Sequence, residues 1–327
     1  MTYLLNPCPC DSEKEYDQCC KMFHDGELTK DALQLMRSRY SAYVLNIPDY
    51  IIKTTHPASP QYSENKFMWK RSISQFSQHT SFQKLEVLDF KEKNTLATVT
   101  FTAHISQNNH DATFTEKSYF EKIHERWFYR GGQLTQGYAP NLVTIGQLRL
   151  LPLAYYGDPI LRKIADPISE INDDIQTLVE EMIETMDASN GVGLAAPQVH
   201  HSIKLFVIRT PIENEQGKYD LGEVKVFINP TLSLPSEETW RAPEGCLSIP
   251  TLRADVERPK EITVEYTSIN GDRIIERLSG WAARVVMHEN DHINGVLYID
   301  RLNPDEQLKF TPILQNLEKR IHDGRAL

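Results

Sequence analysis

The sequence predicts an α+β protein with a boundary near residue 140. Residues 85–129 alternate apolar and polar side chains with the period of two typical of strands, whereas residues 175–186 carry apolar side chains at helical spacing. Charge divides the chain at the same place, because residues 1–140 hold equal numbers of acidic and basic side chains and the net charge of −10 falls on the rest. Gly137 and Pro140 supply turn residues there. We therefore expect a linker over residues 136–145 and a domain over residues 146–327.

Composition excludes several classes of protein. Hydrophobic residues make up 40% of the chain, and no apolar run reaches the roughly 18 residues of a membrane span. The first residues lack the basic start and long apolar stretch of a secretion signal. We expect a cytoplasmic protein with no membrane partner, and the acidic C-terminal part argues against broad nucleic-acid binding.

Four of the five cysteines lie within the first twenty residues, as two close pairs: Cys8 with Cys10, and Cys19 with Cys20. Two such pairs can place four thiolates around one tetrahedral ion, and a reducing cytoplasm disfavours disulfides. The pattern predicts a structural Zn²⁺ module over residues 1–25, with thiol chemistry or free thiols as the alternative.

The sequence predicts a second small α+β domain over residues 26–135. Leu33, Met36, Tyr40 and Tyr43 recur at helical spacing, and Asp31 can cap the helix that they define. Strand patterns follow over residues 85–90, 96–105, 114–123 and 127–129. Four aromatic side chains could line a pocket of the resulting sheet or simply fill its core: Trp69, Phe120, Trp127 and Tyr129.

The C-terminal part begins with an amphipathic helix from about Asp173 to Asn190. Strand patterns then occupy residues 205–208, 224–228, 262–266 and 273–278, and the last two flank a turn at Asn270–Asp272. A further helix carries the pentad His288-Glu289-Asn290-Asp291-His292.

This pentad is the principal candidate site. Residues four apart share one helical face, so His288 and His292 can bind one metal ion, while Glu289 can transfer protons beside it. The alternative is an amphipathic helix whose polar residues are solvated. A catalytic metal needs a third protein ligand, and residues 293–298 offer no Glu, His or Asp.

Two segments upstream of the pentad favour the metal site. Cys246, within Glu244-Gly245-Cys246-Leu247-Ser248, is a candidate third ligand, although a lone cysteine is more often a small buried apolar residue. The small residues of the segment 191–198 permit close backbone approach, and Gln198 at its end supplies an amide donor.

Together, the three segments resemble the motifs of peptide deformylases, over residues from about 145 onward. The resemblance implies a metallohydrolase with Fe²⁺ bound by Cys246, His288 and His292, where Zn²⁺ or Ni²⁺ can substitute. It implies N-formylmethionyl peptides as substrates, with Glu289 as the proton-transfer group. Met287 departs from the family pattern, which usually has Gln there, and this puts the fine tuning of the site in doubt.

The same resemblance implies further roles for residues around the metal. The Gln198 amide and the Leu247 backbone N–H would stabilise the oxyanion. The remaining substrate contacts that it implies are Val192, Gly193, Leu194, Val285 and, near the peptide backbone, Arg253.

The N-terminal part resembles a SEC-C zinc module followed by a YchJ-type NTF2-like domain. The cysteine spacing C-x-C-x8-C-C carries the first likeness, although Asp11 and Glu13 stand where glycines are usual. The likeness implies docking near nascent chains, with the ribosome or another component of protein biogenesis as a candidate partner. Two other functions stay open: a zinc endopeptidase, and an inactive deformylase-like scaffold whose N-terminal part binds a partner.

Overall fold

The structure is a computed structural model that describes residues 7–143, 149–213 and 219–322. The chain forms two compact units, which divide between residues 148 and 149. Residues 144 and 145 of the predicted linker lie outside the described residues. The finer division into residues 1–25, 26–135 and 136–145 stays a prediction.

The first unit packs helices against one antiparallel sheet, whose strands run in the order β1-β2-β4-β5 with β3 beside β2. Its helices are η1 (Tyr16–Gln18), α1 (Cys20–His24), α2 (Ala32–Val44), α3 (Pro48–Lys53), α4 (Lys66–Gln78) and η2 (Pro140–Leu142). Its strands are β1 (Thr80–Lys93), β2 (Leu96–Gln107), β3 (His110–Asp111), β4 (Phe114–Ile123) and β5 (Arg126–Gln136).

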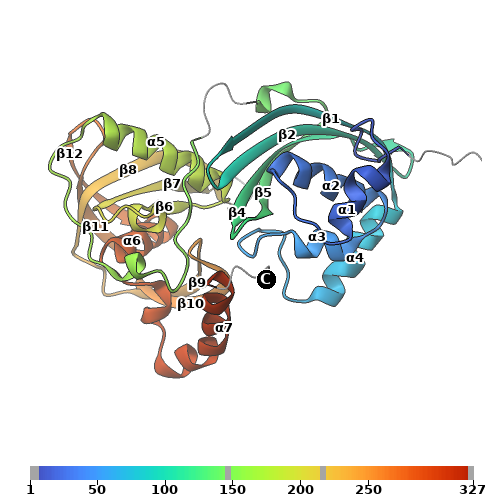
Figure 1. The fold of residues 1–327 in the computed structure, drawn as a ribbon. Coiled ribbons are helices and arrows are strands. Elements are labelled where there is room, and N and C mark those ends of the chain that lie inside the picture. Colours follow the sequence, from blue (N-terminus) through green and yellow to red (C-terminus); the bar gives the residue numbers. More distant parts are fainter. Residues whose placement is uncertain (1–6, 144–148, 214–218, 323–327) are drawn as a thin grey trace, which may run out of the picture. The chain divides into compact units, whose positions relative to one another are not determined.

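Local chemistry explains how α2 begins and why the sheet bends around it. Asp31 accepts a hydrogen bond from the Gln34 backbone N–H at 2.7 Å, which confirms the predicted cap. Register shifts in β1 and between β4 and β5 increase the local twist. The long strands therefore curve around α2 (Figure 1).

The second unit contains a five-stranded antiparallel sheet, in the order β12-β11-β8-β7-β6, and a separate β9–β10 hairpin. Its strands are β6 (Gly193–Ala195), β7 (Leu205–Glu213), β8 (Tyr219–Ser233), β9 (Thr239–Cys246), β10 (Ile249–Pro259), β11 (Glu261–Thr267) and β12 (Arg273–Ser279). Its helices are η3 (Pro159–Arg162), α5 (Asp173–Ala188), η4 (Ala196–Val199), α6 (Gly280–Ile293), η5 (Tyr298–Arg301) and α7 (Pro304–His322). The predicted α+β fold class is confirmed.

Helix α6 is held by the apolar core of this unit. Ala283 and Val286 on α6 belong to one buried cluster with Phe206, Phe227 and Val264 of the sheet. Burial of one face of α6 fixes its rotation about its own axis, which sets the direction of the polar side chains in its last turns. None of the helices in the described part of the chain has both the length and the apolar composition to cross a bilayer.

Because each unit has its own core, we expect a fragment of residues 145–327 to fold alone. It should unfold cooperatively, with a midpoint within a few degrees of the matching transition in the full chain, as followed by circular dichroism. Residues 1–143 provide the complementary fragment. An insoluble 145–327 fragment, or one without a cooperative transition, would show that the first unit is needed to complete the second.

Candidate active site

Three candidate donor atoms converge at the junction of β9 and α6. Cys246 is the last residue of β9, while His288 and His292 lie one turn apart near the end of α6. The sulfur and the two imidazole donors lie within 4.8 Å of one another. Cys246 Sγ is 3.3 Å from His292 Nε2. The structure therefore brings together the three residues that the sequence analysis selected as ligands.

This donor set fits a divalent transition metal. Metal–sulfur and metal–nitrogen bonds of about 2.3 and 2.1 Å place tetrahedral donor atoms about 3.4–3.6 Å apart, close to the observed sulfur–nitrogen separation. His288 engages Glu244 through Nδ1, so its other ring nitrogen is left for the ion. By contrast, Nδ1 of His292 has no hydrogen-bond partner among the described residues.

Glu244 is a site residue that sequence reasoning missed. Its carboxylate accepts two hydrogen bonds from Arg258, at 2.6 and 2.9 Å, and one from Arg284 at 2.6 Å. It also lies 2.9 Å from His288 Nδ1, and all four side chains are buried. Burial alone raises the pKa of Glu244, but Arg258 and His288 outweigh it and hold that pKa well below its usual range. The available signal was the position of Glu244 two residues before Cys246, on the same face of β9.

Arg258 extends this network along α6. Its guanidinium donates to Asp291 Oδ2 at 2.9 Å, and Asp291 also accepts hydrogen bonds from Arg301, at 3.1 and 2.5 Å. Asp291 therefore joins β10 and η5 to the helical turn that lies between the two histidines. Within the pentad, Asp291 thus holds the helix in place, while His288 and His292 contribute the candidate donors.

Glu289 lies beside the donor triad, in a buried space that fits its side chain. The side chain is 4% exposed, and Oε2 has no hydrogen-bond partner among the described residues. Burial raises the pKa of Glu289 to about 7. A Cβ at Gly193 would lie 2.3 Å from Glu289 Oε1, so only glycine leaves room for this carboxylate.

Gln198 on η4 points its amide at the cysteine. Its Oε1 accepts from the Ala195 backbone N–H at 2.8 Å, which fixes the amide orientation. Its Nε2 donates to Cys246 Sγ at 3.4 Å and to Ser248 Oγ at 3.2 Å. Gln198 is fully buried, so its amide is a rigid donor at the edge of the site.

The other predicted site residues differ in their exposure to solvent. Leu247 follows Cys246 in the turn between β9 and β10 and is half-buried. Val192 is 46% exposed, whereas Leu194 is fully buried. Val285 is half-buried on α6, and Arg253 is exposed on β10 opposite Gly245.

Met287 directly precedes His288 on α6, but its side chain packs into the apolar core. It is 7% exposed and belongs to the apolar cluster that joins α6 to the sheet, with Phe206 and Val286 among its members. An apolar side chain is therefore well suited to this position in this chain.

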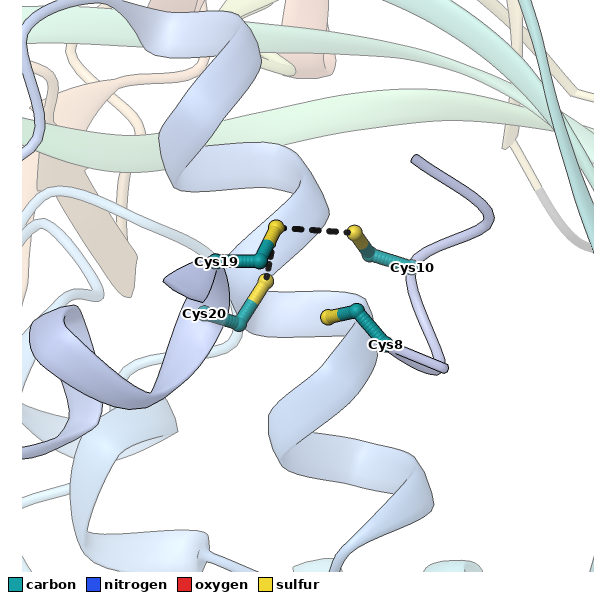
Figure 2. A group of neighbouring side chains, drawn as sticks. All are labelled: Cys8, Cys10, Cys19 and Cys20. Atoms are coloured by element: carbon teal, nitrogen blue, oxygen red, sulfur yellow. Dashed lines mark hydrogen bonds between the residues drawn. The ribbon is translucent and has the colours of Figure 1, made fainter. Parts of the chain in front are cut away.

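The four N-terminal cysteines form a second cluster, whose sulfur atoms lie within 4.8 Å of one another (Figure 2). Their positions are compatible with a tetrahedral zinc site. Asp11 and Glu13 adopt φ of 53° and 62°, the left-handed region that favours glycine, which explains why glycine is usual there. Asp11 has a second function, because its carboxylate accepts the Leu85 backbone N–H at 2.5 Å and ties the cluster to β1.

Comparison with known proteins agrees with both units. A model described as polypeptide deformylase matches residues 150–308, and one described as the middle NTF2-like domain of YchJ matches residues 31–132. A peptide deformylase from Thermotoga sp. (strain RQ2) is 42% identical over 167 residues, which cover 51% of this chain and 95% of that protein. One from Cytophaga hutchinsonii is 38% identical over 170 residues, covering 52% and 91%. The crystal structure of peptide deformylase from Thermotoga maritima covers 47% of this chain and 99% of its own, at 41% identity and a TM-score of 0.43.

An α+β unit that presents a His-Glu-x-x-His helix beside a cysteine at a strand end has the site of a metallohydrolase. The chain belongs to the peptide deformylase family, because its second unit aligns with nearly the whole length of relatives that bear that name. The predicted resemblance to that family and to the NTF2-like YchJ domain is confirmed.

The Glu244 network predicts how tightly the metal is held. Glu244→Gln should lower metal affinity about 10–100-fold, because His288 loses the carboxylate that orients it. Competition with a chromophoric chelator measures this affinity. Glu238→Gln is a matched control, since the Glu238 side chain is 71% exposed on the surface. Equal affinities in the two variants would contradict an orienting role for Glu244.

Proposed function

We propose that this chain hydrolyses the N-formyl group of formyl-methionyl peptides and nascent chains. Water adds to the formyl carbon, the carbon–nitrogen bond breaks, and formate and a free α-amine are released. The single observation that carries the proposal is the convergence of Cys246, His288 and His292 beside the buried Glu289, in a chain of the deformylase family.

Glu289 is the proton-transfer group of this reaction. It accepts a proton from the attacking water and returns it to the leaving amine. A pKa near 7 suits both steps, because the carboxylate and the carboxylic acid are then similar in free energy at neutral pH. The absence of a hydrogen-bond partner for Oε2 among the described residues leaves that oxygen free to bind the water.

Cys246, His288 and His292 would hold the catalytic metal. When bound there, a divalent ion polarises the formyl oxygen and acidifies water. One thiolate and two imidazoles accept Fe²⁺, Zn²⁺ and Ni²⁺. We assign Fe²⁺ as the native ion, with Zn²⁺ or Ni²⁺ as substitutes, from the resemblance to the deformylase family. The Cys8, Cys10, Cys19 and Cys20 cluster would hold Zn²⁺.

The oxyanion that forms on the formyl group is stabilised by hydrogen-bond donors whose orientation is set before the reaction. The Gln198 amide and the Leu247 backbone N–H take this role, and the rigid orientation of Gln198 supports it. The methionine side chain and peptide backbone contact a neighbouring surface made by Val192, Gly193, Leu194, Val285 and Arg253.

A zinc endopeptidase would share the pentad but would take its third ligand from the chain downstream of it. In this chain Cys246, at the end of β9, supplies the third candidate donor instead. The inactive-scaffold alternative requires a missing ligand or base, and all of them are present.

We place the enzyme in the cytoplasm, with residues 1–140 holding it near nascent chains, for example at the ribosome. Docking would raise the local concentration of enzyme where formylated chains emerge.

The assigned roles predict different results for two variants. Glu289→Ala should keep the metal and lose about 10²–10⁴-fold in the rate of formate release from a formyl-Met peptide, since only proton transfer is removed. Cys246→Ala should lose both metal and activity. Metal analysis of anaerobically purified protein, combined with a formate assay, separates the two cases. Full turnover by Glu289→Ala, or an empty site in it, would contradict the assignment.

Ribosome co-sedimentation tests the role of the N-terminal unit. The full chain should sediment with ribosomes, whereas the 145–327 fragment and a Cys19→Ser, Cys20→Ser variant should stay in the supernatant. Equal behaviour of all three proteins would refute docking through residues 1–140.

A further inference from the structure

The first unit contains a cavity of about 770 Å³ that the proposed chemistry does not use. It lies between the curved sheet and the helices α2 and α4, which all contribute to its lining. Protein interiors are close-packed, with few voids larger than a water molecule, whereas small-molecule sites span roughly 300–1,000 Å³. The size of this cavity is therefore that of a ligand site.

Nine aromatic side chains contribute to its lining. They are Tyr40, Tyr43, Trp69, Phe76, Phe82, Phe101, Phe114, Phe120 and Tyr129. Trp127, which the sequence also suggested for a pocket, does not line it and is instead buried in the core. Rings around an open volume favour a flat apolar ligand.

The lining also contains polar side chains, among them the carboxylate of Glu116. The residues of β4 that line the cavity alternate along the strand as Phe114, Glu116, Ser118 and Phe120. Glu116 Oε1 accepts from Ser118 Oγ at 2.5 Å and from Tyr129 Oη at 2.9 Å. Both of these hydrogen bonds use Oε1, which leaves Oε2 for a ligand. A carboxylate in a partly apolar cavity is costly to bury unless it has a partner.

The sheet makes room for this carboxylate. Gly132 on β5 pairs with Ser118, and a Cβ at Gly132 would lie 2.3 Å from Glu116 Oε1. Any larger residue would push the carboxylate from its place. Burial raises the pKa of Glu116, while hydrogen bonds from Ser118 and Tyr129 and the positive charge of Arg39 lower it by less.

A buried cation lies over the ring of the same tyrosine. Arg39 on α2 is 6% exposed, and its guanidinium carbon lies 4.6 Å from the centre of the Tyr129 ring. Its Nη1 donates to Ile51 O, Thr54 Oγ1 and Thr55 Oγ1 at 3.0, 2.8 and 3.1 Å. All of its hydrogen bonds in the described part of the chain use Nη1. Its Nε and Nη2 donors therefore remain for a ligand.

From these contacts we infer that the cavity binds a planar aromatic or heteroaromatic molecule that carries a neutral amide-like group. The amide oxygen accepts from Arg39, the amide N–H donates to Glu116, and the rings stack against the aromatic walls. A carboxylate ligand would face Glu116 and an ammonium ligand would face Arg39, so a neutral group with both a donor and an acceptor matches the pair best.

Isothermal titration of the full chain with 2-naphthamide and with 2-naphthoate tests this inference. 2-Naphthamide should bind one to one with Kd on the order of 10–100 µM, as the size of the ligand allows. 2-Naphthoate should bind about tenfold more weakly, because its charge lies near Glu116. Absence of 2-naphthamide binding up to about 1 mM, or stronger binding of 2-naphthoate, would overturn the inference.

Two variants locate the binding. Glu116→Gln should weaken 2-naphthamide about tenfold and strengthen 2-naphthoate, a reversal that a general loss of structure would not produce. Glu125→Gln is the matched control, because that side chain is 85% exposed in the turn after β4, and it should bind both ligands as the parent does. Ser72→Trp, at an exposed position of α4 that lines the cavity, should abolish binding with the far-UV circular dichroism unchanged. Unchanged affinities in either Glu116→Gln or Ser72→Trp would overturn the inference.

Discussion

The buried carboxylate of Glu244 is the interaction on which the candidate active site depends. It receives hydrogen bonds from Arg258 on β10 and from Arg284 and His288 on α6, so three elements meet at one group. Burial of a charge is costly unless it is fully paired, and removal of one partner from such a cluster typically costs about 3–5 kcal/mol. The position of the metal-facing helix relative to the β9–β10 hairpin is therefore set by electrostatics as well as by apolar packing.

From this constraint the rest of the site follows by local geometry. Cys246 lies two residues beyond Glu244 on β9, so both side chains share one face of the strand. His292 lies one helical turn beyond His288, so both imidazoles share one face of α6. Once Glu244 fixes His288, the sulfur and the second imidazole can reach the same point. The position of the Glu289 carboxylate then depends on the space that Gly193 leaves. Its Oε2 has no hydrogen-bond partner among the described residues.

The sequence predicted the features that short-range periodicity encodes. The pentad on a helix, the Asp31 cap and the alternation of the strands all depend on residues a few positions apart. The role of Glu244 depends on residues 14, 40 and 44 positions away, which no local pattern connects. Asp11 is a further case, because its left-handed backbone is compensated by a hydrogen bond to β1, far along the chain. The sequence also left open whether the aromatic residues of the first unit line a pocket or fill the core. Tyr129 lines the cavity and Trp127 does not, although both belong to the same buried cluster, so the difference depends on tertiary packing that no local pattern encodes.

The central claim is that one thiolate and two imidazoles, held in place by Glu244, meet at a single ion. X-ray absorption at the iron edge tests it most directly, on full-length protein loaded with Fe²⁺ after the N-terminal cysteines have been filled with Zn²⁺. The account predicts one sulfur at about 2.3 Å and two imidazole nitrogens near 2.1 Å. A spectrum with no sulfur neighbour, or with fewer than two imidazoles, would contradict it.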